Sequence, residues 1–72
     1  MIHLPENLQK IGKFAFRDCK YLEKIVFEED SELSEIAKNA FKGCTSLRLV
    51  IIPESTEIVA GDAFPENVRA LK

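Results

Sequence analysis

Apolar residues at every second position predict short strands, in which inward and outward side chains alternate. Ile25 and Phe27 occupy every second position, as the inward side chains of a half-buried strand do. Lys24 and Val26 would then point outward. Residues 2–4 show the same alternation, and residues 50–52 form a third apolar run. We therefore expect strands at about residues 2–4, 25–27 and 50–52.

A second kind of segment lies between the predicted strands. Apolar residues there recur at the spacing of one helix face. The first such stripe is Ile11, Ala15, Cys19 and Leu22, and the second is Ile36, Ala40, Cys44 and Leu47. Each segment is expected to form a short helical turn or a loop that buries its stripe.

These segments belong to a sequence repeat. "IGKFAFRDCKYLEKIVF" (11–27) aligns without gaps with "IAKNAFKGCTSLRLVII" (36–52), 25 residues later. The identical pairs are Ile11/Ile36, Lys13/Lys38, Ala15/Ala40, Phe16/Phe41, Cys19/Cys44 and Leu22/Leu47. A repeat of this length predicts a solenoid whose successive strands pair in parallel. The repeat also sets the phase of the third strand: Val50 and Ile52 inward, Leu49 and Ile51 outward.

The repeat divides the single domain, residues 1–72, into four units. They are a partial unit 1–7, units 8–32 and 33–55, and a degraded or truncated unit 56–72. Two extra residues fall in the acidic stretch 28–33, which marks it as a loop. The last unit has two registers: "DAF" (62–64) matches "NAF" (39–41), which puts Asn67 at a cysteine position and Ala70 at a leucine position. Alternatively, "FPENVRAL" (64–71) matches "LPENLQKI" (4–11).

The block Ile-Gly-x-x-Ala-Phe-x-x-Cys-x-x-Leu-x-x-Ile, followed by a strand and Pro-Glu, resembles the BspA-like leucine-rich repeat. The resemblance covers nearly the whole chain. It implies an α/β leucine-rich repeat solenoid of about two and a half to three coils. Short parallel strands would line the concave face, with short helical turns or loops opposite. It also implies a secreted or cell-surface protein that serves adhesion or protein binding and has no chemistry of its own.

Composition limits the partners. The chain is 46% hydrophobic and 31% charged, which fits one folded domain, and its net charge is −2. That charge argues against nucleic acid or an anionic membrane as the main partner. The longest apolar run, residues 49–52, predicts no membrane insertion. No signal peptide opens the chain, so the extracellular or cell-surface location rests on the resemblance.

The sequence contains few residues that could serve in catalysis or bind a metal or cofactor. His3 is the only histidine and lies at an outward strand position. Two equivalent cysteines and a remote histidine fall short of the roughly four ligands of a zinc site. The acidic stretch 28–32 lacks the spacing of an EF-hand, so a solvated loop is expected. The sequence therefore predicts no enzyme, no metal site and no cofactor.

Two side chains per unit should pack between successive coils. Phe16 and Phe41 are expected to fill the space there. Cys19 and Cys44 should stack as buried thiols or, alternatively, form a disulfide, since equivalent positions on adjacent coils lie about 5 Å apart.

The outward strand positions are the candidate binding site. They are Lys24, Val26, Leu49, Ile51 and His3. An apolar strip on a concave sheet predicts a protein–protein interaction or adhesion module. A host or extracellular matrix protein would be its partner. The alternative is a structural spacer of a larger surface protein with no binding role. Uncapped ends also predict end-to-end self-association.

Overall fold

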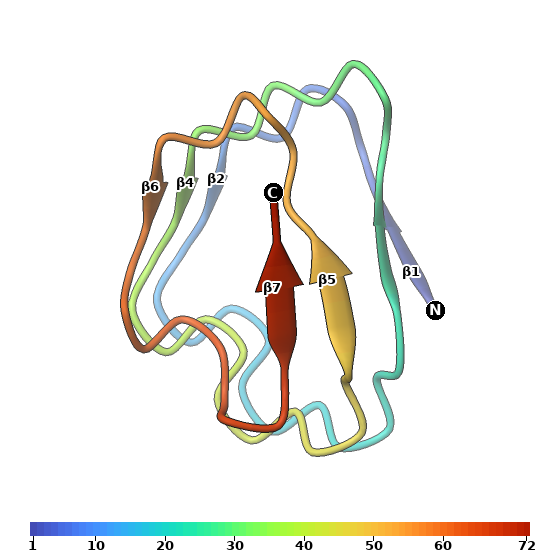
Figure 1. The fold of residues 1–72 in the computed structure, drawn as a ribbon, viewed down its shortest axis with the longest axis vertical. Helices are drawn as coiled ribbons and strands as arrows, with labels where there is room; N and C mark the ends of the chain where they lie inside the picture. The colour runs from blue at the N-terminus through green and yellow to red at the C-terminus, as the bar shows by residue number, and fades with distance from the viewer.

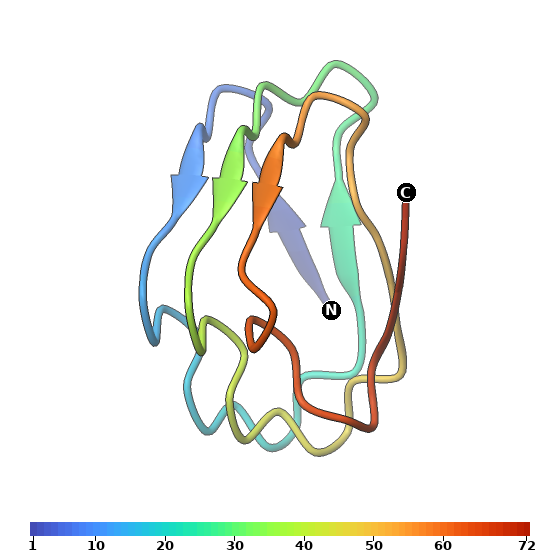
Figure 2. The ribbon, with the colours of Figure 1, turned by 60° about the vertical axis from the view of Figure 1, so that its left-hand side comes forward.

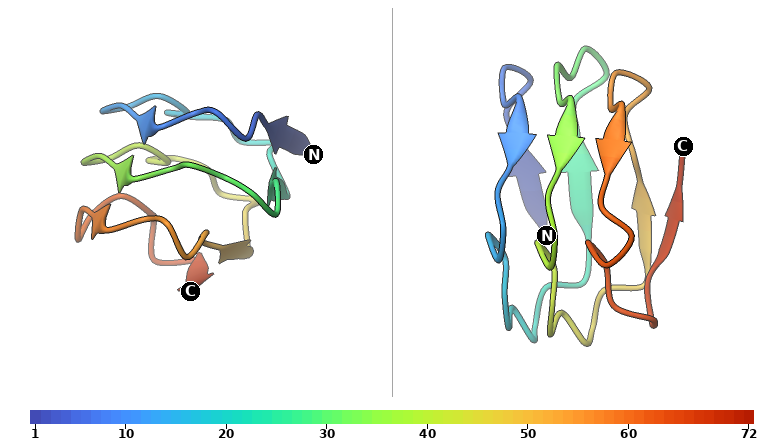
Figure 3. Two further views of the ribbon diagram at one scale, coloured as in Figure 1. Left: turned by 90° about the horizontal axis from the view of Figure 1, so that it is seen from above. Right: turned by 90° about the vertical axis from the view of Figure 1, so that its left-hand side faces the viewer.

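The computed structural model describes all 72 residues and contains seven short strands joined by turns. The strands are β1 (Ile2–Leu4), β2 (Lys10–Ile11), β3 (Ile25–Phe27), β4 (Glu35–Ile36), β5 (Leu49–Ile51), β6 (Ile58–Val59) and β7 (Arg69–Leu71). The chain winds so that each strand comes to lie beside the strand one repeat later (Figure 1). Two rows of strands lie on opposite sides of the winding (Figures 2 and 3).

The first row contains the strands that alternation predicts. β1 pairs with β3 and β5 with β7, in both cases in parallel. The predicted strands 2–4 and 25–27 are confirmed, and the third is shifted by one residue to 49–51. Ile25, Val50 and Ile52 are buried as predicted, whereas Phe27 is half-buried. The repeat therefore predicts the parallel direction of this row and the register of β1 against β3.

The second row was not predicted. β2, β4 and β6 form a continuous parallel sheet in which Lys10 lies opposite Glu35, and Glu35 opposite Ile58. Each of these strands has only two residues, which is too short for an alternation of apolar and polar residues to be recognised in the sequence. This sheet holds successive coils together on the side of the winding that faces away from β3 and β5 (Figure 3).

Of the two alternatives for these segments, helical turns or loops, the structure has loops. The α part of the predicted α/β class is wrong, because the structure contains no helix. Residues 12–22 form consecutive turns with hydrogen bonds between residues three apart, such as Ala15 N to Gly12 O at 3.2 Å. The amides of Phe16 and Asp18 donate instead to the neighbouring coil. Positive φ angles at Phe14 (57°) and Asp18 (60°) also interrupt any helix.

A column of aromatic rings runs through the core. Phe41 is fully buried and stacks on Phe16, with ring centroids 5.0 Å apart, and on Phe64, with centroids 4.9 Å apart. The expected packing of phenylalanines between coils is thus confirmed and extends to a third ring. Ala40 and Ala63 are buried beside it, but Ala15 is exposed, so the first stripe is not buried throughout.

The last coil follows the 23-residue register as far as Phe64, and neither of the two registers describes its strand β7. β6 begins 23 residues after β4 (35 to 58), and Phe64 takes the place of a third stacked ring. β7, however, begins only 20 residues after β5 (49 to 69), so Ala70 lies opposite Val50. The shortening falls in residues 65–68. There, Val68 N donates to Pro65 O as Leu8 N does to Pro5 O.

Asn67 closes the shortened coil. Its side-chain amide donates to the carbonyl oxygens of Cys44 (3.1 Å) and Leu47 (2.8 Å). We expect Asn67→Ala to lower the free energy of unfolding by about 1–2 kcal/mol because both acceptors lose their donor. Urea denaturation followed by circular dichroism measures this. Asn7→Ala, which changes the asparagine of the related Pro-Glu-Asn turn, should be nearly neutral, because the Asn7 side chain makes no such hydrogen bond. Equal losses in both variants would contradict this role of Asn67.

Candidate binding face

The five predicted site residues lie on one face, called here the strand face: the outward side chains of β1, β3 and β5. His3 lies opposite Val26 in the β1–β3 pair. Leu49 and Ile51 are 46% and 57% exposed, Lys24 and His3 are exposed, and Val26 is half-buried. The structure therefore places the five predicted residues on one surface.

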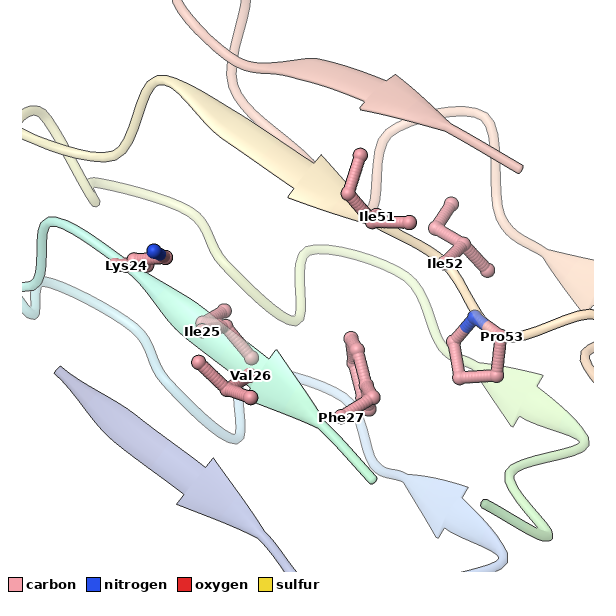
Figure 4. A pocket seen from close by; sticks show the side chains of 7 residues that line it. All are labelled: Lys24, Ile25, Val26, Phe27, Ile51, Ile52 and Pro53. Carbon is pink, nitrogen blue, oxygen red and sulfur yellow. The ribbon is translucent and has the colours of Figure 1, made fainter. Parts of the chain in front are cut away.

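The strand face is interrupted between β3 and β5. These two strands face each other but share no hydrogen-bonded ladder, although their Cα atoms come within 8 Å. The opening is a groove of about 310 Å³ bordered by side chains of both strands (Figure 4). Its lining residues are Lys24, Ile25, Val26, Phe27, Ile51, Ile52 and Pro53.

On the β5 side, main-chain groups face the groove without a strand partner. The amide of Ile52 donates to Leu71 O at 2.6 Å, so that residue is engaged with β7. In a parallel ladder, alternate residues of a strand serve its two neighbours. The N–H and C=O groups of Leu49 and Ile51 therefore point toward β3.

The β3 side has the same arrangement. Lys24 O accepts a hydrogen bond from Ile2 N at 3.0 Å and so is engaged with β1. By the same alternation, the main-chain groups of Ile25 and Phe27 face β5 across the groove. Both borders of an apolar groove thus offer free donors and acceptors, which is the chemistry that recognises an extended peptide.

Charges of opposite sign lie at the two ends of the strands. The basic side chains at the strand starts are Lys24, Arg48 and Arg69, all exposed. Glu28 and Glu54 are exposed beyond the strand ends, and Glu23 is an acidic exception at the basic edge. None of the three ion pairs of the structure involves these residues. Because parallel strands share their direction, the strand face has a basic and an acidic edge.

Two parts of this surface were not predicted from the sequence: its extension onto β7 and the groove. Arg69 and Leu71 extend the face beside Leu49 and Ile51, but they could be assigned only with the correct register of the last unit. The groove depends on the absence of pairing between two strands that the repeat predicts to pair. No signal in the sequence marks it.

The remaining chemical groups do not form a further site of this kind. Glu28, Glu29 and Asp30 are exposed, and the structure holds no cluster of three or more His, Cys, Asp or Glu side chains that could ligate a metal. Cys19 is half-buried and Cys44 is buried, and both are free thiols, so the expected buried stack is only partly confirmed. Burial raises the pKa of the Cys44 thiol. The structure contains no helix that is long and apolar enough to cross a membrane.

Comparison with known protein families supports the repeat that the sequence shows. The model of the BspA type leucine rich repeat region (6 copies) matches residues 1–71. No curated protein and no solved structure matches the chain significantly. Repeats of this type are generally protein-binding modules, are typically not catalytic and often occur in surface or secreted proteins. The match spans nearly every residue, and the chain therefore belongs to the BspA-type leucine-rich repeat family.

Proposed function

We propose that this chain is part of a leucine-rich repeat solenoid that binds a partner protein through the strand face. The observation that carries the proposal is the β3–β5 groove, where apolar side chains and free main-chain groups lie together. An extended segment of the partner would lay apolar side chains against Val26 and Ile51. Its main chain would bond to the strand borders without being inserted as a full strand, because the Cα approach is too close for one.

The edges of the strand face would orient the bound segment. An acidic group of the partner would lie toward Lys24 and Arg48, and a basic group toward Glu28 and Glu54. Such rim charges contribute to orientation and association rate more than to affinity. We further propose adhesion at the cell surface or in a secreted protein as the biological setting, which the family supports.

The test uses a displayed library of linear peptides, panned against the folded chain. We expect selected peptides to carry apolar residues flanked by opposite charges. Val26→Ser with Ile51→Ser should weaken their binding by tenfold or more, about 1.4 kcal/mol, because both side chains border the groove. Fluorescence anisotropy with the selected peptides measures the loss.

The matched control is Ile58→Ser with Val59→Ser, which changes two exposed apolar residues of β6 in the opposite row. It should leave peptide binding unchanged. Equal weakening by the two double variants would contradict binding at the strand face. Selection of no peptide above background would favour the structural-spacer function instead, in which the coils supply length alone.

A further inference from the structure

The two cysteines occupy matching positions on adjacent coils. Lys20 N donates to Asp18 O at 2.8 Å, and Thr45 N donates to Gly43 O at 2.9 Å, so each cysteine is the central residue of the same tight turn. The next hydrogen bonds match as well: Cys19 O and Cys44 O each accept from the amide of the leucine three residues later. Equal backbone geometry sends the two side chains in the same direction.

The first two coils lie in close contact beside these cysteines. Asp18 N donates across to Lys42 O at 2.7 Å, and this bond sets Cys19 level with Cys44. A Cβ atom on Gly43 would lie only 3.1 Å from the Cα atom of Asp18. The Cys44 thiol also reaches the first coil, since its Sγ donates to Phe16 O at 3.1 Å. Backbone segments joined by hydrogen bonds lie about 5 Å apart, which is within the Cα separation that a disulfide spans.

We propose that Cys19 and Cys44 form an inter-coil disulfide by exchange with a low-molecular-weight disulfide such as oxidised glutathione. Cys19 is the half-buried thiol and reacts first: its thiolate attacks one glutathione sulfur, a mixed disulfide forms and one glutathione thiolate leaves. Cys44 then loses its proton to water and attacks Sγ of Cys19, which expels the second glutathione thiolate. The protein's two thiols are oxidised, glutathione disulfide is reduced, and the two released protons protonate the leaving thiolates.

The order of attack follows from burial. Cys44 is fully buried, and desolvation raises its pKa, with the charges of Cys19 and Asp18 adding to this effect. A buried thiol of this kind is a poor first nucleophile, but it lies at the matching position of the adjacent coil and can attack the mixed disulfide from there. Its hydrogen bond to Phe16 O is given up when the disulfide forms.

The bond would join only the first two coils. In the third coil Asn67 takes the corresponding place and contacts Cys44 O through hydrogen bonds instead. The loop closed between residues 19 and 44 restricts the unfolded chain, which is the usual source of disulfide stabilisation. Such a bond persists in oxidising compartments.

The experiment treats the folded chain with oxidised glutathione and follows its intact mass. We expect a loss of two hydrogens, a linked peptide containing Cys19 and Cys44 after digestion, and reversal by dithiothreitol. The midpoint of thermal unfolding should rise by about 8 °C or more. Because oxidised and reduced wild-type chains are compared directly, the test does not depend on a variant that folds.

Cys19→Ser serves as the control: treated in the same way, it should show neither the loss of two hydrogens nor the rise in midpoint. A glutathione adduct that persists on Cys19 of the wild-type chain would overturn the proposal, because Cys44 would then be out of reach. A disulfide-linked dimer, or a bond that forms only in denaturant, would overturn it as well.

Discussion

Phe41→Ala should leave most of the protein unfolded at room temperature. The Phe41 ring is fully buried between two other rings, so truncation removes its contacts on both sides and leaves a cavity. Replacing a buried phenylalanine by alanine typically costs about 3–5 kcal/mol. A core of this size rarely supplies more than about 3–5 kcal/mol in total. Circular dichroism with urea titration would show the loss of the folded baseline.

Two controls locate the effect. Tyr21→Ala removes an aromatic side chain that is 95% exposed and should change the free energy of unfolding by no more than about 0.5 kcal/mol. Phe16→Ala should cost less than Phe41→Ala, since Phe16 is half-buried and stacks on one ring only. A Phe41→Ala chain as stable as the Tyr21→Ala chain would show that the aromatic column does not hold the coils together.

Gly43→Ala should lower the free energy of unfolding by about 2 kcal/mol or more. Gly43 has a φ angle of +83°, which costs an L-residue about 1–2 kcal/mol. The added methyl group would also collide with Oδ1 of Asp18 and lie 3.2 Å from its backbone N. The carboxylate can swing away, but the backbone of Asp18 is hydrogen-bonded to the second coil. Strain of both kinds therefore falls where Gly43 packs against the backbone of Asp18 on the first coil.

The other two glycines provide a matched comparison. An added Cβ at Gly12 or Gly61 meets nothing within 4 Å, and neither residue has a positive φ angle. Gly12→Ala and Gly61→Ala should thus be neutral or raise the free energy of unfolding by about 0.4–1 kcal/mol, since alanine restricts the unfolded chain. Thermal unfolding of the three variants side by side would reveal the difference. A Gly43→Ala chain that melts with the other two would refute the predicted strain.

The first row of strands could be predicted because burial has a period of two around Ile25 and because the repeat copies that phase onto Val50. The same repeat predicted the contact of Phe16 with Phe41. These features depend on side chains that alternate or recur, and such patterns are visible in a sequence. Among the candidate site residues, Lys24, Val26 and Ile51 border the groove, while Leu49 and His3 lie on the same face beyond it.

The prediction of helical turns was wrong for a physical reason. A series of turns with hydrogen bonds between residues three apart brings Cys19 and Leu22 to one side, much as a helix would. The apolar stripe is therefore compatible with both structures. The amides of Phe16 and Asp18 decide between them, because they bond to the second coil and are not available for helix formation. Such competition between coils cannot be seen in one repeat alone.

The uneven pairing of the coils also has a mechanical consequence. The β2–β4–β6 sheet and the aromatic column join successive coils by hydrogen bonds and stacked rings, so lengthening that side breaks contacts. Between β3 and β5 no ladder has to break. We therefore expect the array to bend more easily by widening between β3 and β5, with the opposite sheet as the hinge, than by widening on the side of that sheet.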